Sequence, residues 1–278
     1  MQTKIEWEEI RRQKTLEYGT EYRDWIWILV KQYKDRTHFL FELLQNAEDA
    51  GASTVRLVLA EDRLTLEHDG KLFSREDVIS ITKIKSSKNG SGSIGKFGIG
   101  FKSVYAYTLA PRIYSGDYAF EIRDFLFPYA IAPVSLQSGW TRIEIPFDRR
   151  EDSTGREEAA SESDLAEIRR GAFTEVARAL HKQMDETVLL FLNHIKTLEI
   201  QIQGEPRRIR ITKETGDVTQ SAACVSADML QAAIRISTDG GSERTKSYWI
   251  FTDNREKTAV ALLHQGADCC VAGFAEKS

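Results

Sequence analysis

The sequence predicts an α+β fold in which helices cover one face of a mixed, mainly antiparallel sheet. Helical spacing of apolar residues dominates the first 50 residues, and short segments of alternating polarity follow them. The order is helices, a hairpin, a glycine-rich segment with a helix, antiparallel strands, and helices again. A doubly wound parallel sheet requires regular strand–helix alternation, which this order does not have.

Three helices are expected at the start of the chain. Residues 4–17 and 21–34 carry apolar residues at mixed three- and four-residue spacing, as a buried helix face requires. The third helix starts near Asp35 and ends before Gly51, a residue type that commonly terminates helices.

A hairpin and a short helix follow. Residues 54–59 and 63–68 alternate apolar and polar side chains, which predicts two paired strands. Ser74 and Asp77 have the spacing of a capping box, so a short helix opens there. Five glycines within residues 86–100 then interrupt the regular pattern.

Strands and helices continue to alternate irregularly in the second half. Strands are expected at 112–115, 118–123, 140–145, 197–203 and 207–212, and helices at 163–184 and 186–194. We expect residues 1–203 to form one domain. Residues 204–278 are β-rich, and we expect them to be the truncated start of a second domain.

Composition excludes several classes of function. The 38 basic and 42 acidic residues give a net charge of −4, which argues against a protein that wraps nucleic acid. Three cysteines are too few for a disulfide framework or a four-ligand zinc site and indicate a reduced, cytoplasmic protein. We expect no secretory signal, because the first twenty residues mix charges of both signs, and the apolar run Trp25–Val30 is too short to span a bilayer.

The first chemically distinctive segment is the helix Phe41–Ala50. Glu42, Asn46 and Asp49 stand at i, i+4 and i+7, so they share one helix face. Their oxygen atoms suit Mg²⁺, an ion that keeps several waters and is often shared with substrate phosphates. On this helix alone, an ordinary solvated polar face explains the pattern as well.

Two further segments suggest nucleotide chemistry. Asp69-Gly70 ends a strand; such a pair usually forms a turn, but a carboxylate can accept a hydrogen bond from the amino group of adenine. Gly95, Gly98 and Gly100 form a G-x-x-G-x-G run that opens a helix. Glycines let the backbone approach a phosphate, although the run fits neither a Walker A loop nor a Rossmann fingerprint, and a flexible loop is the alternative.

Taken together and in this order, the three segments resemble the Bergerat-fold (GHKL) ATPases. Glu42–Ala50 is similar to the family's E-x-x-x-N-x-x-D-A box, Asp69-Gly70 to its adenine-binding Asp, and Gly95–Phe101 to its second glycine box. The greatest similarity is to the sacsin-like relatives of the N-terminal ATP-binding module of the ninety-kilodalton heat-shock chaperone. It extends over residues 20–203 and includes Ser86-Ser87-Lys88.

The resemblance implies ATP and Mg²⁺ as cofactors. Asn46 would ligate Mg²⁺, and Glu42 would orient and deprotonate the attacking water. Asp69 would bind the adenine amino group, with Thr141 as a second, water-linked contact, and Asp49 would support the pocket.

The resemblance also implies which segments surround the phosphates. Residues 82–94 would form a lid, from which Lys88 would make a charge contact. The phosphates would be wrapped by Gly95, Lys96, Phe97, Gly98, Ile99, Gly100 and Phe101. His38 and His68 are interpreted as packing or surface residues.

The chain departs from the family pattern at two places. Lys71–Phe73 follow Gly70, where the pattern has a further glycine, and Trp140 separates Gly139 from Thr141. The first departure concerns the residues that would surround the adenine, and the second concerns the assignment of Thr141.

The expected function is Mg²⁺-dependent ATP binding with slow hydrolysis. It would serve as a conformational switch in a larger chaperone-like protein or in a bacterial antiviral defence protein. ATP, a downstream domain or effector, and a second copy bound in the presence of ATP are the expected partners, without a membrane or nucleic acid. A nucleotide-sensing module without turnover, which gates an effector such as a nuclease, is the alternative; a structural protein with a vestigial pocket is a third.

Overall fold

The structure is a computed structural model that describes residues 7–18, 35–83, 100–149, 161–220, 227–241, 243–253, 258–265 and 268–276. The helix expected at 21–34 lies outside the described residues. So do all but the first two residues of the expected lid, 82–94, and most of the glycine run.

The expected α+β architecture is confirmed. Within the described residues, twelve strands form one mixed sheet in the order β12-β11-β10-β9-β8-β7-β1-β2-β6-β3-β4-β5. At its centre, β1 (Thr54–Ala60) pairs antiparallel with β2 (Arg63–His68) and parallel with β7 (Thr197–Ile202). The strands on the other side of the hairpin are β6 (Thr141–Pro146), β3 (Arg112–Ser115), β4 (Tyr118–Arg123) and β5 (Phe127–Ala130).

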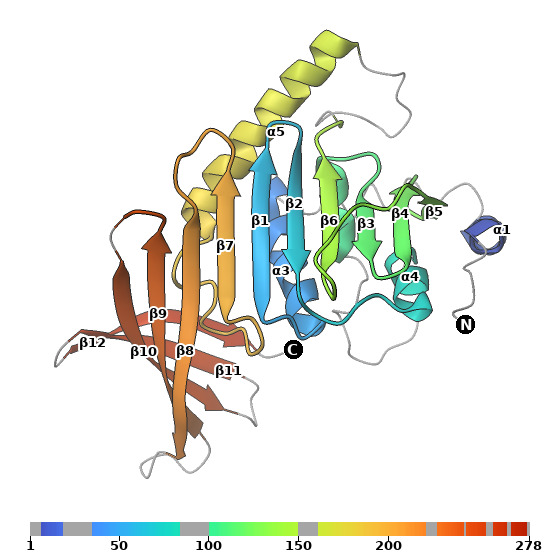
Figure 1. The fold of residues 1–278 in the computed structure, drawn as a ribbon. Helices are drawn as coiled ribbons and strands as arrows, with labels where there is room; N and C mark the ends of the chain where they lie inside the picture. The colour runs from blue at the N-terminus through green and yellow to red at the C-terminus, as the bar shows by residue number, and fades with distance from the viewer. Residues whose placement is uncertain are drawn as a thin grey trace.

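The C-terminal part is β-rich, as expected. It contains β8 (Ile209–Gln220), β9 (Ala227–Thr238), β10 (Arg244–Asp253), β11 (Thr258–Gln265) and β12 (Asp268–Glu276), coloured orange to red and turning away from the central strands in Figure 1. β8 hydrogen-bonds to β7 with Thr197 opposite Thr212, so the sheet continues across the expected boundary at residue 203. The division into two domains stays a prediction.

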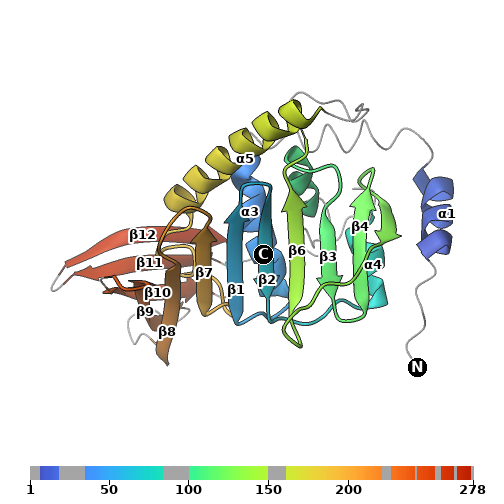
Figure 2. The ribbon, with the colours of Figure 1, turned by 45° about the horizontal axis from the view of Figure 1, so that its top comes forward.

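Helices lie against one face of the central strands (Figures 1 and 2). They are α3 (Phe39–Asp49), α4 (Arg75–Ile81) and α5 (Glu162–Gln183), while α1 (Trp7–Tyr18) contacts β5 and two short 3₁₀ helices, η1 (Arg36–His38) and η2 (Gly100–Ala106), flank α3. Leu43 and Ala47 of α3 and Leu57 and Leu66 of the hairpin are buried in the core between the layers. Burial of this apolar surface, worth about 25 cal/mol per Å², holds α3 on the sheet.

Local sequence signals fixed several boundaries correctly. The capping box of Ser74 and Asp77 is formed at the start of α4. The long helix α5 has a second capping box, Ser161 with Asp164, so it begins one residue before the expected Ser163. Of the helices in the described ranges, none combines the length and the apolar character that crossing a membrane requires.

The helix expected at 186–194 is wrong, because this segment forms turns. Its backbone groups bind two distant side chains. The Lys213 ammonium donates to the carbonyls of Leu189, Leu190 and Leu192, and the Glu48 carboxylate accepts from the amides of Asn193, His194 and Ile195. Long-range partners of this kind replace the hydrogen bonds that a helix would form.

A buried lysine ties α4 to the turn before β5. Lys102 Nζ donates to the carbonyls of Ile81 and Phe125 at 2.8 and 2.6 Å. Lys14 of α1 donates to the carbonyl of Thr82, the next residue along. Burial, with repulsion from the Lys14 ammonium, lowers the pKa of Lys102 to about 7.

Replacement of Lys102 by Met should therefore change how stability depends on pH. Between the folded pKa of about 7 and the ordinary value of 10.5, the unfolded chain holds the proton that the folded chain has released. The free energy of unfolding of the wild type should rise with pH relative to Lys102→Met, by at most about 1.4 kcal/mol per pH unit. Urea titrations over this pH range measure the difference.

The matched control is Lys182→Met, which changes an exposed lysine of α5. Its difference from the wild type should stay flat over the same range. A flat difference for Lys102→Met as well would contradict the assignment of a lowered pKa to Lys102.

Candidate functional site

The N-terminal half of α3 positions Glu42. Asp35 caps η1 by accepting from the amide of Thr37 at 2.8 Å, which directs the chain into α3. One turn into the helix, Glu42 keeps 27% of its side chain exposed, and its Oε1 lies 3.2 Å from Nε2 of His38. The carboxylate is thus oriented by a neighbour and reachable from outside.

The end of the glycine run lies directly against this carboxylate. A Cβ atom at Gly100 would stand 1.9 Å from Glu42 Oε2 and 2.5 Å from its Cδ, so only glycine fits without movement of Glu42. Phe101, the next residue, is buried in the core. The sequence-predicted glycine box and the predicted catalytic helix are therefore in contact at this point.

The C-terminal end of α3 contacts the end of β2. A Cβ atom at Gly70 would stand 2.9 Å from the carbonyl oxygen of Ala50, and the Lys71 amide donates to this carbonyl at 2.8 Å. All three segments that the sequence singled out thus meet along α3.

Asn46 lies between these two contacts. Its side chain is buried, with 7% of the residue exposed, and Nδ2 has no hydrogen-bond partner among the described residues. A buried polar atom without a partner costs about 1–3 kcal/mol and is rare in folded proteins. The amide is accordingly suited to a ligand that brings polar atoms of its own.

Asp49 completes the polar stripe at the exposed end of α3. Its Oδ1 accepts from Gln45 Nε2 at 3.0 Å, and the residue is exposed. The stripe therefore runs from the half-buried Glu42 through the buried Asn46 to the exposed Asp49.

Asp69 anchors the loop between α3 and β1. Its Oδ1 accepts from the amides of Ser53 and Thr54 at 2.7 and 2.8 Å, and Oδ2 accepts from Ser53 Oγ at 2.6 Å. Burial alone would raise the pKa of this carboxyl, but the hydrogen bonds from Ser53 and Thr54 outweigh it and lower the pKa. Both oxygens thus have protein partners.

A polar row crosses the helix-facing side of the sheet at the same level. His68, Thr141 and Ser115 are register neighbours on β2, β6 and β3, and all three are buried. Thr141 Oγ1 lies 2.5 Å from Ser115 Oγ, which also accepts from the Phe73 amide at 2.9 Å. The sequence selected Thr141 but neither of the other two; strict alternation along β2 was the signal that could have placed His68 beside Leu64 and Leu66.

The remaining predicted site residues cannot be placed. Lys88, Gly95, Lys96, Phe97, Gly98 and Ile99 lie outside the described residues. Within the described ranges, no three His, Cys, Asp or Glu side chains are grouped so that they could hold a metal ion.

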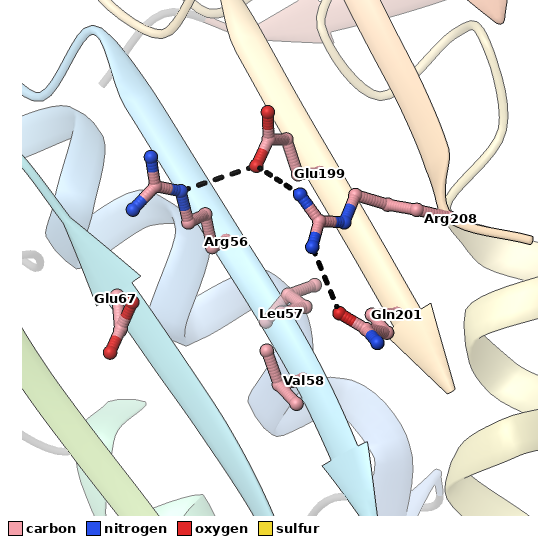
Figure 3. A pocket seen from close by; sticks show the side chains of 7 residues that line it. All are labelled: Arg56, Leu57, Val58, Glu67, Glu199, Gln201 and Arg208. Carbon is pink, nitrogen blue, oxygen red and sulfur yellow. Dashed lines mark hydrogen bonds and ion pairs between the residues drawn. The ribbon is translucent and has the colours of Figure 1, made fainter. Parts of the chain in front are cut away.

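A groove on the opposite face of the sheet is distinct from this site (Figure 3). Arg56, which lines it, alternates along β1 with the core residues Val55 and Leu57 and so points away from α3. Its charges pair with one another: Glu199 Oε2 lies 3.2 Å from Arg56 Nε and 3.8 Å from Arg208 Nη1. The groove is a network of ion pairs on the sheet face.

The fold and site define an α+β module in which a helix, a strand end and a glycine segment converge. The Sacsin domain family matches residues 20–129. The chain is similar to Sacsin of Homo sapiens (34% identical over 113 residues, 34% of this chain and 2% of that protein). It is also similar to Protein NO VEIN of Arabidopsis thaliana (30% identical over 119 residues, 38% of this chain and 4% of that protein). It therefore spans a small fraction of the curated relatives it matches.

Solved structures with a similar chain path include the N-terminal domain of a DNA repair protein, with a TM-score of 0.45, 11% identity, and coverage of 77% of this chain and 72% of that chain. Another is the B-subunit of the DNA gyrase from Myxococcus xanthus, with a TM-score of 0.40, 12% identity, and coverage of 82% of this chain and 67% of that chain.

Replacement of Asp69 by Ala should destabilise the chain, because two backbone amides and a hydroxyl lose a charged acceptor. We expect the free energy of unfolding to fall by about 2 kcal/mol. Because folding lowers the pKa of Asp69, this contribution is present above its ordinary value of 3.8 and is lost as the pH falls below it.

Chemical denaturation at neutral and acidic pH measures both effects. Asp49→Ala is the matched control, since it removes an exposed carboxylate with one hydrogen bond and should change stability by about 0.5 kcal/mol or less. Equal losses for the two variants would contradict an anchoring role for Asp69.

Proposed function

We propose that this chain binds ATP together with Mg²⁺ along α3 and hydrolyses it slowly. The observation that carries the proposal is the close approach of Gly100 to Glu42, which joins a glycine segment to a reachable carboxylate. Backbone amides at such a segment suit phosphate oxygens, and a carboxylate next to it suits the activation of water.

The residues present fit the two absent groups. Asn46 offers a buried Nδ2 donor without a described partner, which suits a phosphate oxygen, and its amide oxygen is a ligand type that Mg²⁺ accepts. When bound, Mg²⁺ neutralises charge on the phosphates. We assign phosphate binding to the segment Gly95–Phe101 and a charge contact to Lys88, and of these Gly100 and Phe101 have described positions against α3.

Glu42 is the proposed general base. Its Oε1 is held by His38, and its exposed portion can accept a proton from a water molecule. His38 is a positioning residue in this scheme, since it fixes the carboxylate without touching the substrate. The strand end at residues 68–70 and Thr141 are assigned to the nucleobase.

We further propose that the module acts as a conformational switch inside a larger protein. The long relatives that it matches support a downstream domain or effector as its partner. Chaperone-like and bacterial defence proteins are the proposed contexts, with ATP-dependent pairing of two copies. A cytoplasmic location is proposed because three cysteines suit a reducing compartment.

The test of nucleotide binding is Asn46→Ala. The wild type should gain about 2.7 kcal/mol of stability at a Mg-ATP concentration of about 100 Kd. Asn46→Ala should lose most of this gain, while its stability without nucleotide should stay the same or rise, because an unpaired buried amide is removed. Thermal unfolding with and without Mg-ATP measures both.

The matched control for this experiment is Gln45→Ala, one position earlier on the exposed face of α3. It should keep the stabilisation by Mg-ATP. A full gain in Asn46→Ala would remove Asn46 from the site, and no gain in the wild type would overturn the proposed function.

The test of hydrolysis is Glu42→Gln. The variant should bind Mg-ATP as the wild type does and should release phosphate roughly 10²–10⁴ times more slowly, because it lacks the base. Phosphate release under single-turnover conditions measures the rate. Undiminished release would exclude Glu42 as the base, and a wild type that binds ATP without any release would instead support a nucleotide-sensing module that does not turn over.

A further inference from the structure

The direction of the His68 side chain follows from the alternation along β2. Leu64, Leu66 and His68 are buried on the face that α3 covers, with 3% of His68 exposed. Glu67 faces the other side, where Arg142 donates to it at 2.6 Å. His68 is therefore the last side chain of β2 that points between the sheet and the helices.

The Asp69 side chain points toward the loop before β1. The strand ends at His68, and the next carboxylate bonds to Ser53 and Thr54 of the loop before β1. To reach a ligand between the sheet and the helices, the Asp69 carboxylate would have to break its three hydrogen bonds. A group already bound in this way is a poor partner for a nucleobase.

The environment of His68 is polar and adjoins the proposed site. Across the sheet its register partner is Thr141, and Ser115 follows in the same row. Along the chain, Gly70 packs against Ala50, one helical turn after Asn46. Thr141 and Ser115 hydrogen-bond to each other, so within this row the His68 ring is the group that keeps hydrogen-bonding capacity for a base edge.

One hydrogen bond determines the tautomer of the His68 ring. The Gly70 amide donates to His68 Nδ1 at 3.1 Å, so Nδ1 bears the lone pair and Nε2 bears the hydrogen. Burial, opposed by the charge of Asp69, lowers the pKa of His68 to about 4. The ring is therefore neutral at physiological pH, and Nε2 is a hydrogen-bond donor that bonds to no described residue.

We propose that His68, and not Asp69, reads the nucleobase, and that it does so as a hydrogen-bond donor to a ring nitrogen of the purine. This inference rests on the proposed function and names the residue that determines its base specificity. A carboxylate would instead select the amino group of the base, so the two assignments make opposite demands on the ligand.

The test compares ligands that differ by one atom or group. Calorimetric titration of Mg-ATP is set against its 1-deaza, 3-deaza and 7-deaza analogues and against purine riboside triphosphate, which lacks the amino group. The proteins are the wild type, His68→Leu, His68→Gln and Asp69→Asn. His68→Gln keeps a donor near the position of Nε2, whereas His68→Leu removes it.

The proposal predicts that one ring-nitrogen deletion weakens binding to the wild type about tenfold or more. His68→Leu should bind that analogue and ATP equally within about threefold, and His68→Gln should restore part of the difference. Asp69→Asn should keep the wild-type ratios for every ligand, although its stability is lower.

Two results would overturn the proposal. One is that the three deaza analogues bind the wild type as ATP does. The other is that loss of the amino group weakens binding tenfold and that this difference disappears in Asp69→Asn. The wild-type titrations decide the first result even where a His68 variant does not fold. A wild type that binds none of the triphosphates would instead be a failure of the proposed function itself.

Discussion

The close packing of α3 between two glycines is the constraint on which the site depends. Gly100 leaves no room for a side chain beside Glu42, and Gly70 leaves none beside Ala50. The Gly70 contact is with the backbone carbonyl oxygen of Ala50 and fixes the end of α3 against the end of β2, whereas the Gly100 contact is with the end of the Glu42 side chain and brings the glycine segment beside its carboxylate. Because the core face of α3 is buried on the sheet at the same time, the positions of Glu42 and Asn46 follow from packing that is independent of any ligand.

Local patterns predicted the elements whose structure is decided locally. Alternation gave both strands of the central hairpin, and the capping box at Ser74 gave the start of α4. The turns at 186–194 could not be predicted in this way, because Lys213 and Glu48 bind their backbone from distant elements. The pairing of β8 with β7 is likewise a long-range contact, and a change in composition near residue 204 does not reveal it.

Much of the candidate site was predictable from spacing, but the direction of side chains was not. The i, i+4 spacing correctly put Glu42 and Asn46 on one helix, while their different burial depends on what packs above each of them. At the end of β2, an Asp before Gly stands out in a sequence more than the preceding His does. Which of the two faces the interior is decided by the register with β6 and by the donors that Ser53 and Thr54 supply.

The carboxylates anchored near α3 differ in charge from the groups that are left for a ligand. Glu48 and Asp69 each accept several backbone amides, which satisfies their charge within the protein. Asn46 and His68, whose polar atoms keep hydrogen-bonding capacity beyond their described partners, are neutral. A nucleoside triphosphate is strongly anionic, so unpaired carboxylates in the interior would repel it. In the proposed function, Glu42, which is partly exposed at the start of α3, is the carboxylate positioned for chemistry, whereas Glu48 and Asp69 are structural anchors.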